Sequence, residues 1–228
     1  MIDCHIHCLP EIDDGARNTD TTKKMFEMLK SQGVSKVVAT PHFPYEVGTV
    51  SEFLKMRDRS VAKALSVLPD GMQLLTGAEV AVMRGISGVE EIEKLKIGNT
   101  NRMLFEFSIT PFEPWRFEEV FNISYFHSLK PVYAHVERIE DFKKNGFDEL
   151  NEIDGAIFQI TAQSVFLKPV KKLISYMLDR DADIVIATDA HDAGRRPPCL
   201  SDAYAEIEKY FGKDVLEMMK NTAESIIL

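Results

Sequence analysis

The amino-acid sequence predicts an α/β protein whose parallel strands form a closed or nearly closed barrel. Short β-prone runs alternate with stretches of helical periodicity along the whole chain, and the alternation repeats about every 30 residues. Polar side chains suited to binding metals gather just after the predicted strands, as they do at the C-terminal rim of parallel α/β barrels. Because seven such units use all 228 residues, we expect one domain over residues 1–228.

The predicted strands are short runs rich in Val, Ile, Leu or Phe, typical of strands buried on both faces. They lie at residues 1–6, 34–40, 73–80, 102–107, 131–136, 156–161 and 183–188. The predicted helices lie at residues 19–32, 51–67, 87–95, 116–129, 139–152, 168–181, 200–211 and 213–225. Asn18 or Thr19 is a suitable N-cap for the first helix, Gly33 stands just past its end, and Gly146 is a candidate break in the fifth.

Charge and hydropathy exclude several classes of protein. The chain carries 27 Lys and Arg against 36 Asp and Glu, and this net charge of −9 argues against a general nucleic-acid binder. No apolar run approaches the roughly 18 residues needed to span a bilayer, and the N-terminus lacks the regions of a signal peptide. Three cysteines (Cys4, Cys8 and Cys199) do not make a disulfide framework. We therefore expect a cytoplasmic protein without membrane insertion.

Five of the six histidines fall at or just beyond the C-terminal ends of predicted strands, and carboxylates occupy the same level. The set comprises His5, His7, His42, His135 and His191 together with Asp13, Asp14, Glu79, Glu106 and Asp189. In a parallel α/β barrel these strand ends meet at one rim, where active sites are assembled. We therefore expect these side chains to converge, and we expect His127, within a predicted helix, to be structural.

The spacing and charge of this set predict a metal site. In the motifs HIH (5–7) and DAH (189–191), the period-two geometry of a strand points both outer side chains to the same side. Ligands of the His, Asp and Glu types without thiolate favour divalent Mn, Fe or Zn. Carboxylates gathered this closely would repel one another strongly unless cations balanced them. Two or three divalent cations would do so and leave the pocket able to accept an anionic substrate.

Each residue of the set also has an ordinary structural explanation. A single HxH motif occurs by chance, and a histidine at a strand end is commonly a hydrogen-bonded polar residue. So many suitable groups at different strand ends are much harder to explain in this way. We therefore interpret the set as functional, while any single member stays open to the structural explanation.

Two arginines follow the same rim. Arg138 lies three residues after His135, and Arg196 lies five residues after His191. A guanidinium group is always charged and binds phosphate oxygens in a bidentate fork, whereas an isolated surface arginine would form a salt bridge. No cysteine is followed six positions later by arginine, and neither a Gly-rich phosphate loop nor Gly-x-Ser-x-Gly is present. The remaining route to hydrolysis is a metal-activated water.

Several sequence blocks from one end of the chain to the other form a recognisable series. They are MIDCHIHCLPEIDDGA (1–16), ATPHF (39–43), TGAEV (76–80), LFEFS (104–108), PVYAHVERI (131–139), QITAQS (159–164) and TDAHDAGRRPP (188–198). Their order resembles the PHP (polymerase and histidinol phosphatase) superfamily, and within it the bacterial manganese-dependent protein-tyrosine phosphatases of capsule and exopolysaccharide synthesis. HxH alone is common, whereas its combination with IDDGA, AHxER and DAH followed by RPP is specific.

The resemblance implies a distorted (β/α)7, TIM-like barrel that holds up to three manganese ions, with Fe or Zn as alternatives. The implied ligand groups are His5, His7, Glu79 and Asp189 for the first ion, Glu79, Glu106 and His135 for the second, and Asp14, His42 and His191 for the third. Asp13 is then either a ligand or a partner of one. Arg138 and Arg196 match the phosphate-contacting arginines of the family, and Arg195 is the neighbour most easily mistaken for the latter.

The resemblance further implies a phosphomonoester hydrolase that acts on a phosphotyrosine protein, with a bacterial tyrosine autokinase as the expected partner. A metal-bound hydroxide would attack phosphorus in line while both arginines stabilise the developing charge, so that no phosphoenzyme forms. Phe43 and Trp115, with Tyr45 and Phe112, would line an aromatic entrance for the phenyl ring or serve equally as packing residues.

Three alternatives stay open at this point. A histidinol-phosphate phosphatase, or another small-molecule phosphatase of the same superfamily, would use the same metals. An amidohydrolase-type metalloenzyme also begins with HxH, but it usually needs a bridging Lys and an eighth strand. A non-catalytic binding module would keep the metal cluster for stability alone. The sequence does not specify the native ion, the oligomeric state or a role for residues 213–228.

Overall fold

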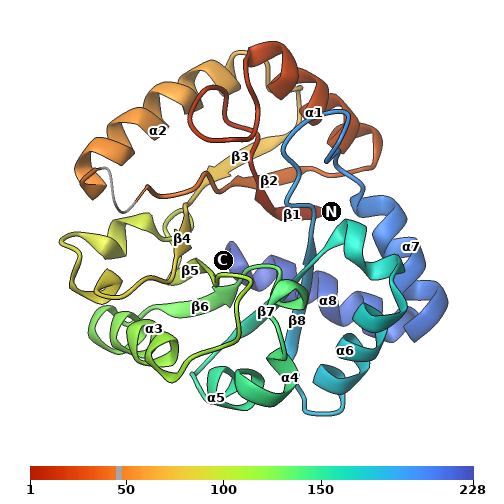
Figure 1. The fold of residues 1–228 in the computed structure, drawn as a ribbon. Helices are drawn as coiled ribbons and strands as arrows, with labels where there is room; N and C mark the ends of the chain where they lie inside the picture. Colours follow the sequence, from red (N-terminus) through yellow and green to blue (C-terminus); the bar gives the residue numbers. More distant parts are fainter. Residues whose placement is uncertain (45–47) are drawn as a thin grey trace.

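In the computed structural model, which describes residues 1–44 and 48–228, parallel strands form a ring with helices packed around its outside (Figure 1). The strands are β1 (Ile2–Ile6), β2 (Lys36–Ala39), β3 (Gln73–Thr76), β4 (Glu79–Ala81), β5 (Arg102–Glu106), β6 (Lys130–Tyr133), β7 (Ile157–Thr161) and β8 (Asp183–Ala187). They form two parallel sheets, with the orders β1-β2-β3 and β4-β5-β6-β7-β8. The predicted α/β fold with parallel strands is confirmed.

The two sheets meet at two seams, where isolated bridges replace a regular ladder. At the β1–β8 seam, Ile6 bridges Ala190, and the Asp189 N–H donates to the His5 carbonyl over 2.8 Å. At the other seam, His42, just after β2, bridges Glu79 at the start of β4. The seams complete the ring as a distorted barrel.

The predicted strand at 73–80 is wrong in one respect, because the structure divides it into β3 and β4. Each part pairs with a different sheet, and the break falls at Gly77 and Ala78. A Cβ atom at Gly77 would lie 3.0 Å from the side chain of Ile97, so the chain passes too close to its neighbour for an ordinary residue.

The helices that surround the ring mostly follow the prediction. They are α1 (Thr19–Ser31), α2 (Val50–Leu65), α3 (Pro114–His127), α4 (Phe142–Asn145), α5 (Phe147–Asn151), α6 (Lys168–Leu178), α7 (Leu200–Phe211) and α8 (Lys213–Ile226). Asn18 caps α1 by accepting the Thr21 N–H over 2.9 Å, and Gly146 separates α4 from α5, so both expectations are confirmed. Within the residues described, no helix has the length and apolarity to cross a membrane.

The predicted helix at 87–95 is wrong. The segment forms two short 3₁₀ helices, η1 (Ile86–Gly88) and η2 (Ile92–Leu95). Glu91 has a left-handed backbone with φ of 64°, which ends any continuous helix at that point. Further 3₁₀ helices follow β6 and β7, namely η3 (Val136–Arg138) and η4 (Ala162–Phe166).

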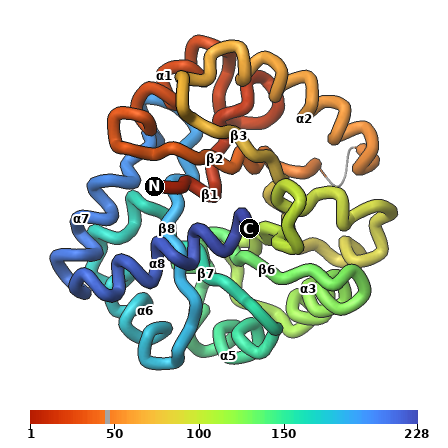
Figure 2. The backbone as a smooth tube through the Cα atoms, turned by 180° about the vertical axis from the view of Figure 1, so that it is seen from behind, coloured from red at the N-terminus to blue at the C-terminus, as the bar shows by residue number. Residues whose placement is uncertain are grey.

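Helix α8 closes the end of the ring at which the strands begin. Figure 2 shows α8 crossing this face, with the C-terminus near its centre. Ala223 and Ile226 join an apolar cluster with residues near the strand starts, such as Ile2 and Ile157. Residues 213–226 therefore fill the N-terminal end of the barrel and leave the C-terminal rim to the polar side chains.

Replacement of Ile226 by Ala tests this role of α8. Ile226 is fully buried, so the change should leave a cavity and lower the free energy of unfolding by about 3 kcal/mol. Urea unfolding in the presence of a chelator measures the effect. Leu228, which is 92% exposed two residues later, is the matched control, because L228A should change stability by less than about 0.5 kcal/mol. Equal stability of the two variants would contradict the proposed packing.

Candidate metal centre

The rim residues predicted from the sequence meet in one polar cluster at the C-terminal ends of the strands. His5 and His7 come from β1 and its end, Glu79 from β4, Glu106 from β5, His135 from the turn after β6, Asp189 and His191 from the loop after β8, and Asp14 and His42 from the loops after β1 and β2. Short contacts connect all nine residues. Most of them are buried, while Glu106 and His42 are partly exposed and Asp14 is open to solvent.

Irregular backbone aims these side chains inward. The β1–β2 register shifts between Asp3 and Ile6, which interrupts the alternation of side chains just before the HIH motif ends. His135 and Asp189 have left-handed backbones, with φ of 33° and 50°. Such a conformation costs about 1–3 kcal/mol in a residue other than glycine, and it is typical of functional sites.

The first group of contacts surrounds one oxygen of Glu79. Its Oε2 atom lies 3.2 Å from His5 Nε2 and 3.1 Å from His7 Nε2, and these two nitrogens lie 3.2 Å apart. Asp189 Oδ1 is 3.6 and 3.5 Å from the same nitrogens. Although Glu79 Oε2 is buried, no donor among the described residues forms a hydrogen bond to it. A buried carboxylate oxygen that faces imidazole nitrogens but accepts no hydrogen bond fits a ligand of a cation that it shares with them.

The second group lies on the other oxygen of Glu79. Its Oε1 atom is 2.9 Å from His135 Nε2, which is 3.5 Å from Glu106 Oε1. His42 Nδ1 approaches Glu79 Oε2 and Glu106 Oε2 at 3.2 and 3.7 Å. Glu79 thus connects the first and second groups, which is the arrangement that the family resemblance implies.

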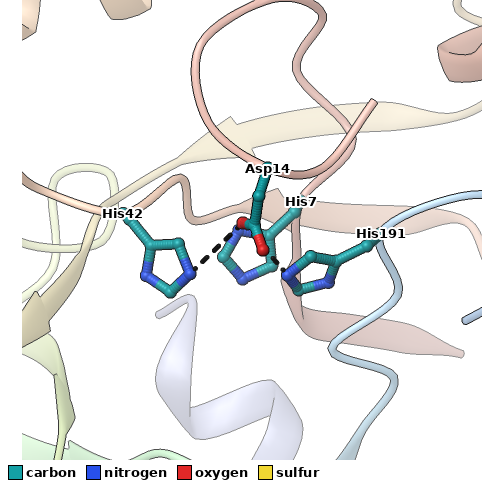
Figure 3. Close-up of side chains that lie close together, drawn as sticks. All are labelled: His7, Asp14, His42 and His191. Atoms are coloured by element: carbon teal, nitrogen blue, oxygen red, sulfur yellow. Dashed lines mark ion pairs between the residues drawn. The ribbon is translucent and has the colours of Figure 1, made fainter. Parts of the chain in front are cut away.

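The third group is arranged around Asp14 (Figure 3). Its Oδ1 atom lies 3.5 Å from His42 Nε2 and 3.4 Å from His191 Nε2. The His7 ring lies 4.0 Å from the His191 ring and 4.6 Å from the His42 ring, measured between centroids. His7 therefore faces both the first and the third group, and this position was not predicted from the sequence.

Hydrogen bonds on the outer nitrogens fix how these imidazoles face. His7 Nδ1 lies 2.7 Å from Asp13 Oδ2, and Asp13 also accepts the backbone N–H groups of Gly15 and His42. His191 Nδ1 lies 3.0 Å from the Asp189 carbonyl oxygen. An Nδ1–H donated outward leaves Nε2 free to face a cation. Asp13 therefore acts as a partner of proposed ligands, which is one of the two roles left open by the sequence.

Gln159 forms hydrogen bonds with two residues of the cluster, His5 and His135, and its role was missed in the sequence. Its Oε1 atom lies 3.0 Å from His5 Nδ1 and accepts the His135 backbone N–H over 2.7 Å. The side chain is fully buried on β7. The available signal was an amide in the middle of an otherwise apolar strand, because a buried amide needs hydrogen-bond partners.

The two arginines meet on Asp189. The Nη2 atoms of Arg138 and Arg196 lie 2.5 and 2.6 Å from Asp189 Oδ2, whereas Oδ1 of the same carboxylate faces His5 and His7. About a third of each arginine side chain is exposed. Both guanidinium groups thus stand at the edge of the cluster with part of their surface open.

The pKa shifts in the cluster indicate that its buried carboxylates need compensating positive charge. Burial lowers the pKa of His5 and His7, but contacts with carboxylates outweigh this and hold both pKa values above the usual range. Burial raises the pKa of Glu79 and Asp189, but the facing imidazoles, and Arg138 for Asp189, keep both pKa values low. Without metal, protonation of His5 and His7 would compensate the charge of the two carboxylates. A divalent cation can replace these protons, so the residues fit a metal centre.

The pKa values of Glu106 and His191 shift in the opposite directions to those of the residues above. Burial and the neighbouring Glu79 raise the pKa of Glu106. Burial, His7 and Arg196 lower the pKa of His191 to about 4, so this imidazole stays neutral at neutral pH and can bind a cation without losing a proton.

The predicted aromatic entrance is only partly visible. Phe43 is 3% exposed and packs edge-on against Phe53 in the core, and Phe112 is buried against Phe107, so both have packing roles. Trp115, at the start of α3, is partly buried, with Arg84 4.5 Å from its ring centroid. Tyr45 lies outside the described residues.

Comparison with known proteins agrees with this geometry. The family model described as "Capsular polysaccharide synthesis, CpsB/CapC" matches residues 1–228. This chain belongs to the CpsB/CapC family. It is 30% identical to the tyrosine-protein phosphatase CpsB of Streptococcus pneumoniae, with 100% of this chain and 98% of the relative covered. The family resemblance inferred from the sequence is confirmed.

Solved structures give the same fold for this CpsB/CapC chain. One from the study of the metal-dependent tyrosine phosphatases YwqE of Bacillus subtilis and CpsB of S. pneumoniae superposes with a TM-score of 0.81 at 24% identity, covering 100% of this chain and 94% of that one. The phosphotriesterase homology protein of Escherichia coli superposes with a TM-score of 0.53 at 11% identity, over 99% and 98% of the two chains.

Replacement of Gln159 by Leu should weaken metal binding about 10- to 100-fold, because His5 Nδ1 and the His135 N–H lose their shared acceptor. Isothermal titration of the metal-free protein with Mn²⁺ measures this affinity. Q163L is the matched control, because Gln163 is exposed and its amide donates to the Pro197 carbonyl rather than to a residue of the cluster. Equal Mn²⁺ affinity in Q159L and Q163L would show that Gln159 does not orient the ligands.

Metal affinity should fall as the pH is lowered. Because contacts with carboxylates outweigh burial and raise the pKa values of His5 and His7, protons compete with a cation for these imidazoles more strongly than for ordinary histidines. For each proton that the cation displaces, the Mn²⁺ affinity should fall by about tenfold for every unit by which the pH is lowered below the pKa of that imidazole. Calorimetry in two buffers with different ionisation enthalpies counts the released protons. A pH-independent affinity without proton release would refute this charge balance.

Proposed function

We propose that this protein is a metal-dependent protein-tyrosine phosphatase of capsule or exopolysaccharide synthesis, and that its substrate is a phosphotyrosine protein such as a bacterial tyrosine autokinase. The observation that carries the proposal is the meeting of Arg138 and Arg196 on Asp189, at the open edge of the histidine and carboxylate cluster. A phosphate-binding pair beside a metal-binding cluster suits phosphate ester hydrolysis. The name of the S. pneumoniae relative supports the same activity.

For the metal, we propose manganese in up to three positions, with Fe or Zn as alternatives. The three groups described above would hold the ions, with Glu79 between the first and second and His7 facing the first and third. Imidazole and carboxylate donors suit these ions, and the cysteines pack in the apolar clusters instead. When bound, such cations would activate a water for attack on phosphorus and neutralise phosphate charge.

The two arginines would bind and orient the phosphate group. Each guanidinium uses only Nη2 on Asp189, so its other donors remain for phosphate oxygens. Because Asp189 already holds both groups in place, little side-chain entropy is lost when phosphate binds. Arg138 and Arg196 would then stabilise the charge that develops in the transition state.

A cysteine phosphoenzyme does not suit this chain. Cys4 and Cys8 are buried, and burial raises the pKa of both thiols. Burial also raises the pKa of Cys199 to about 11. A thiol must ionise to act as a nucleophile, so we propose direct transfer of the phosphoryl group to water. The unpaired state of all three cysteines agrees with the cytoplasmic location that we propose.

For the phenyl ring of the substrate, we retain Trp115 as the candidate contact. It is the one aromatic residue of the predicted entrance that is both described and partly exposed. Its ring lies at the start of α3, after the strand that carries Glu106. Phe43, with almost no exposed surface, instead supports the loop that carries His42.

Phosphate release from a phosphotyrosine peptide and from histidinol phosphate, with metal content measured on the same Mn²⁺-loaded sample, tests the proposed function. We expect the peptide to be the better substrate. R138A and R196A should each lower kcat/KM by about 10²- to 10³-fold, since each removes a donor to the transition state. R180A is the charge-matched control, because Arg180 lies between α6 and β8 at the opposite end of the barrel.

Each outcome of this experiment has a distinct meaning. Preference for histidinol phosphate would assign a small-molecule phosphatase. A fully metal-loaded protein without phosphate release would assign a non-catalytic module. Unchanged kcat/KM in R138A and R196A would exclude these arginines from phosphate binding.

A further inference from the structure

A cavity of about 570 Å³ opens beside the third group of the metal centre. Asp14 and His191 line it on the side of the cluster, and the other lining residues include Arg17, Asp192, Arg195 and Arg196. We propose that this cavity binds an anionic side chain of the substrate that lies next to the phosphotyrosine in sequence. The proposal rests on the proposed phosphatase function and adds to it a preference for acidic or phosphorylated flanking residues.

The charge of the cavity favours an anion. Arg17 and Arg195 are exposed, and neither forms an ion pair with any residue in the described part of the chain. The cavity thus presents three guanidinium groups on a protein with a net charge of −9. Two exposed guanidinium groups that form no ion pair among the described residues at one surface opening provide strong donors for a carboxylate or a phosphate.

The two carboxylates of the cavity, Asp14 and Asp192, offset only part of the charge of its three arginines. Asp14 is a proposed metal ligand, with Oδ1 directed at His42 and His191. Asp192 Oδ1 accepts the backbone N–H groups of Gly194 and Arg195, each over 2.5 Å, and that of Arg196 over 3.4 Å. Asp192 thus shapes the loop that carries Arg195 and Arg196, and it does so through Oδ1.

The same loop connects the cavity to the phosphate position. Arg196 contacts Asp189 in the metal centre and also lines the cavity. The preceding residue, Arg195, lines the cavity without an ion pair to Asp189. The His191 N–H donates to the Arg196 carbonyl over 3.0 Å, which holds the loop against the cluster. A phosphotyrosine whose phosphate lies on Arg138 and Arg196 would therefore place a neighbouring residue at Arg195 and Arg17.

A set of phosphotyrosine peptides tests the proposal with the Mn²⁺-loaded protein. One peptide has neutral flanks, one has two Glu residues before the phosphotyrosine, and one has two Glu residues after it. A fourth repeats whichever Glu peptide has the higher kcat/KM, with phosphoserine in place of its Glu residues. We expect at least one Glu peptide to exceed the neutral peptide in kcat/KM by about five- to tenfold, as two partly exposed ion pairs would give. Comparison of the Glu and phosphoserine peptides distinguishes a carboxylate from a phosphate as the preferred anion.

The variants identify the residues responsible. In an R17A/R195A double variant, the ratio of kcat/KM for the acidic and neutral peptides should fall to about one, and R180A should keep the ratio of the unmodified protein. High salt should also reduce the ratio, because exposed charges are screened. Equal rates on acidic and neutral peptides, or a preference that persists in R17A/R195A, would overturn this inference while leaving the phosphatase assignment intact. Failure to hydrolyse any peptide would overturn both.

Discussion

The buried carboxylate of Glu79 is the constraint on which the rest of the site depends. Its two oxygens face four different imidazoles at 2.9 to 3.2 Å, and the side chain is almost fully buried. A charge removed from water in this way costs several kcal/mol unless opposite charge compensates it. The surrounding histidines can supply that charge only by binding protons or by sharing cations with the carboxylate. The geometry of the whole cluster follows from this balance.

The two seams of the barrel explain how so many ligand-type side chains reach one place. Glu79 and His42 bridge at one seam, and the β1–β8 seam carries the HIH and DAH motifs. Asp3 joins the strands of that second seam by accepting the Thr188 N–H over 2.9 Å and its hydroxyl over 2.5 Å. A regular ladder would enforce strict alternation of side chains, whereas bridged seams allow neighbouring residues to turn inward. The distortion of the barrel and the formation of the site therefore have a common origin.

The sequence predicted the fold and the site membership because both depend on local patterns. Apolar runs and helical periodicity located nearly every strand and helix, and residue type at strand ends located the nine residues that meet in the cluster. The errors arose from contacts between distant segments. The division of 73–80 depends on the approach of Ile97 to Gly77. The inward turn of Gln159 depends on His5, on β1, and on His135, in the turn after β6. Periodicity within one segment contains no information about such contacts.

Asp189 connects the proposed metal ligands to the proposed phosphate-binding arginines. One oxygen faces the imidazoles of the first group, and the other holds Arg138 and Arg196, so any movement of this carboxylate displaces both the proposed ligands and the proposed phosphate-binding groups. The arrangement also solves an electrostatic problem, because an anionic substrate must approach a protein with a net charge of −9. Positive charge is concentrated where the phosphate would bind and extends along one loop to Arg195. The attraction is therefore local, and it acts on a substrate only when its anionic groups are spaced to match that loop.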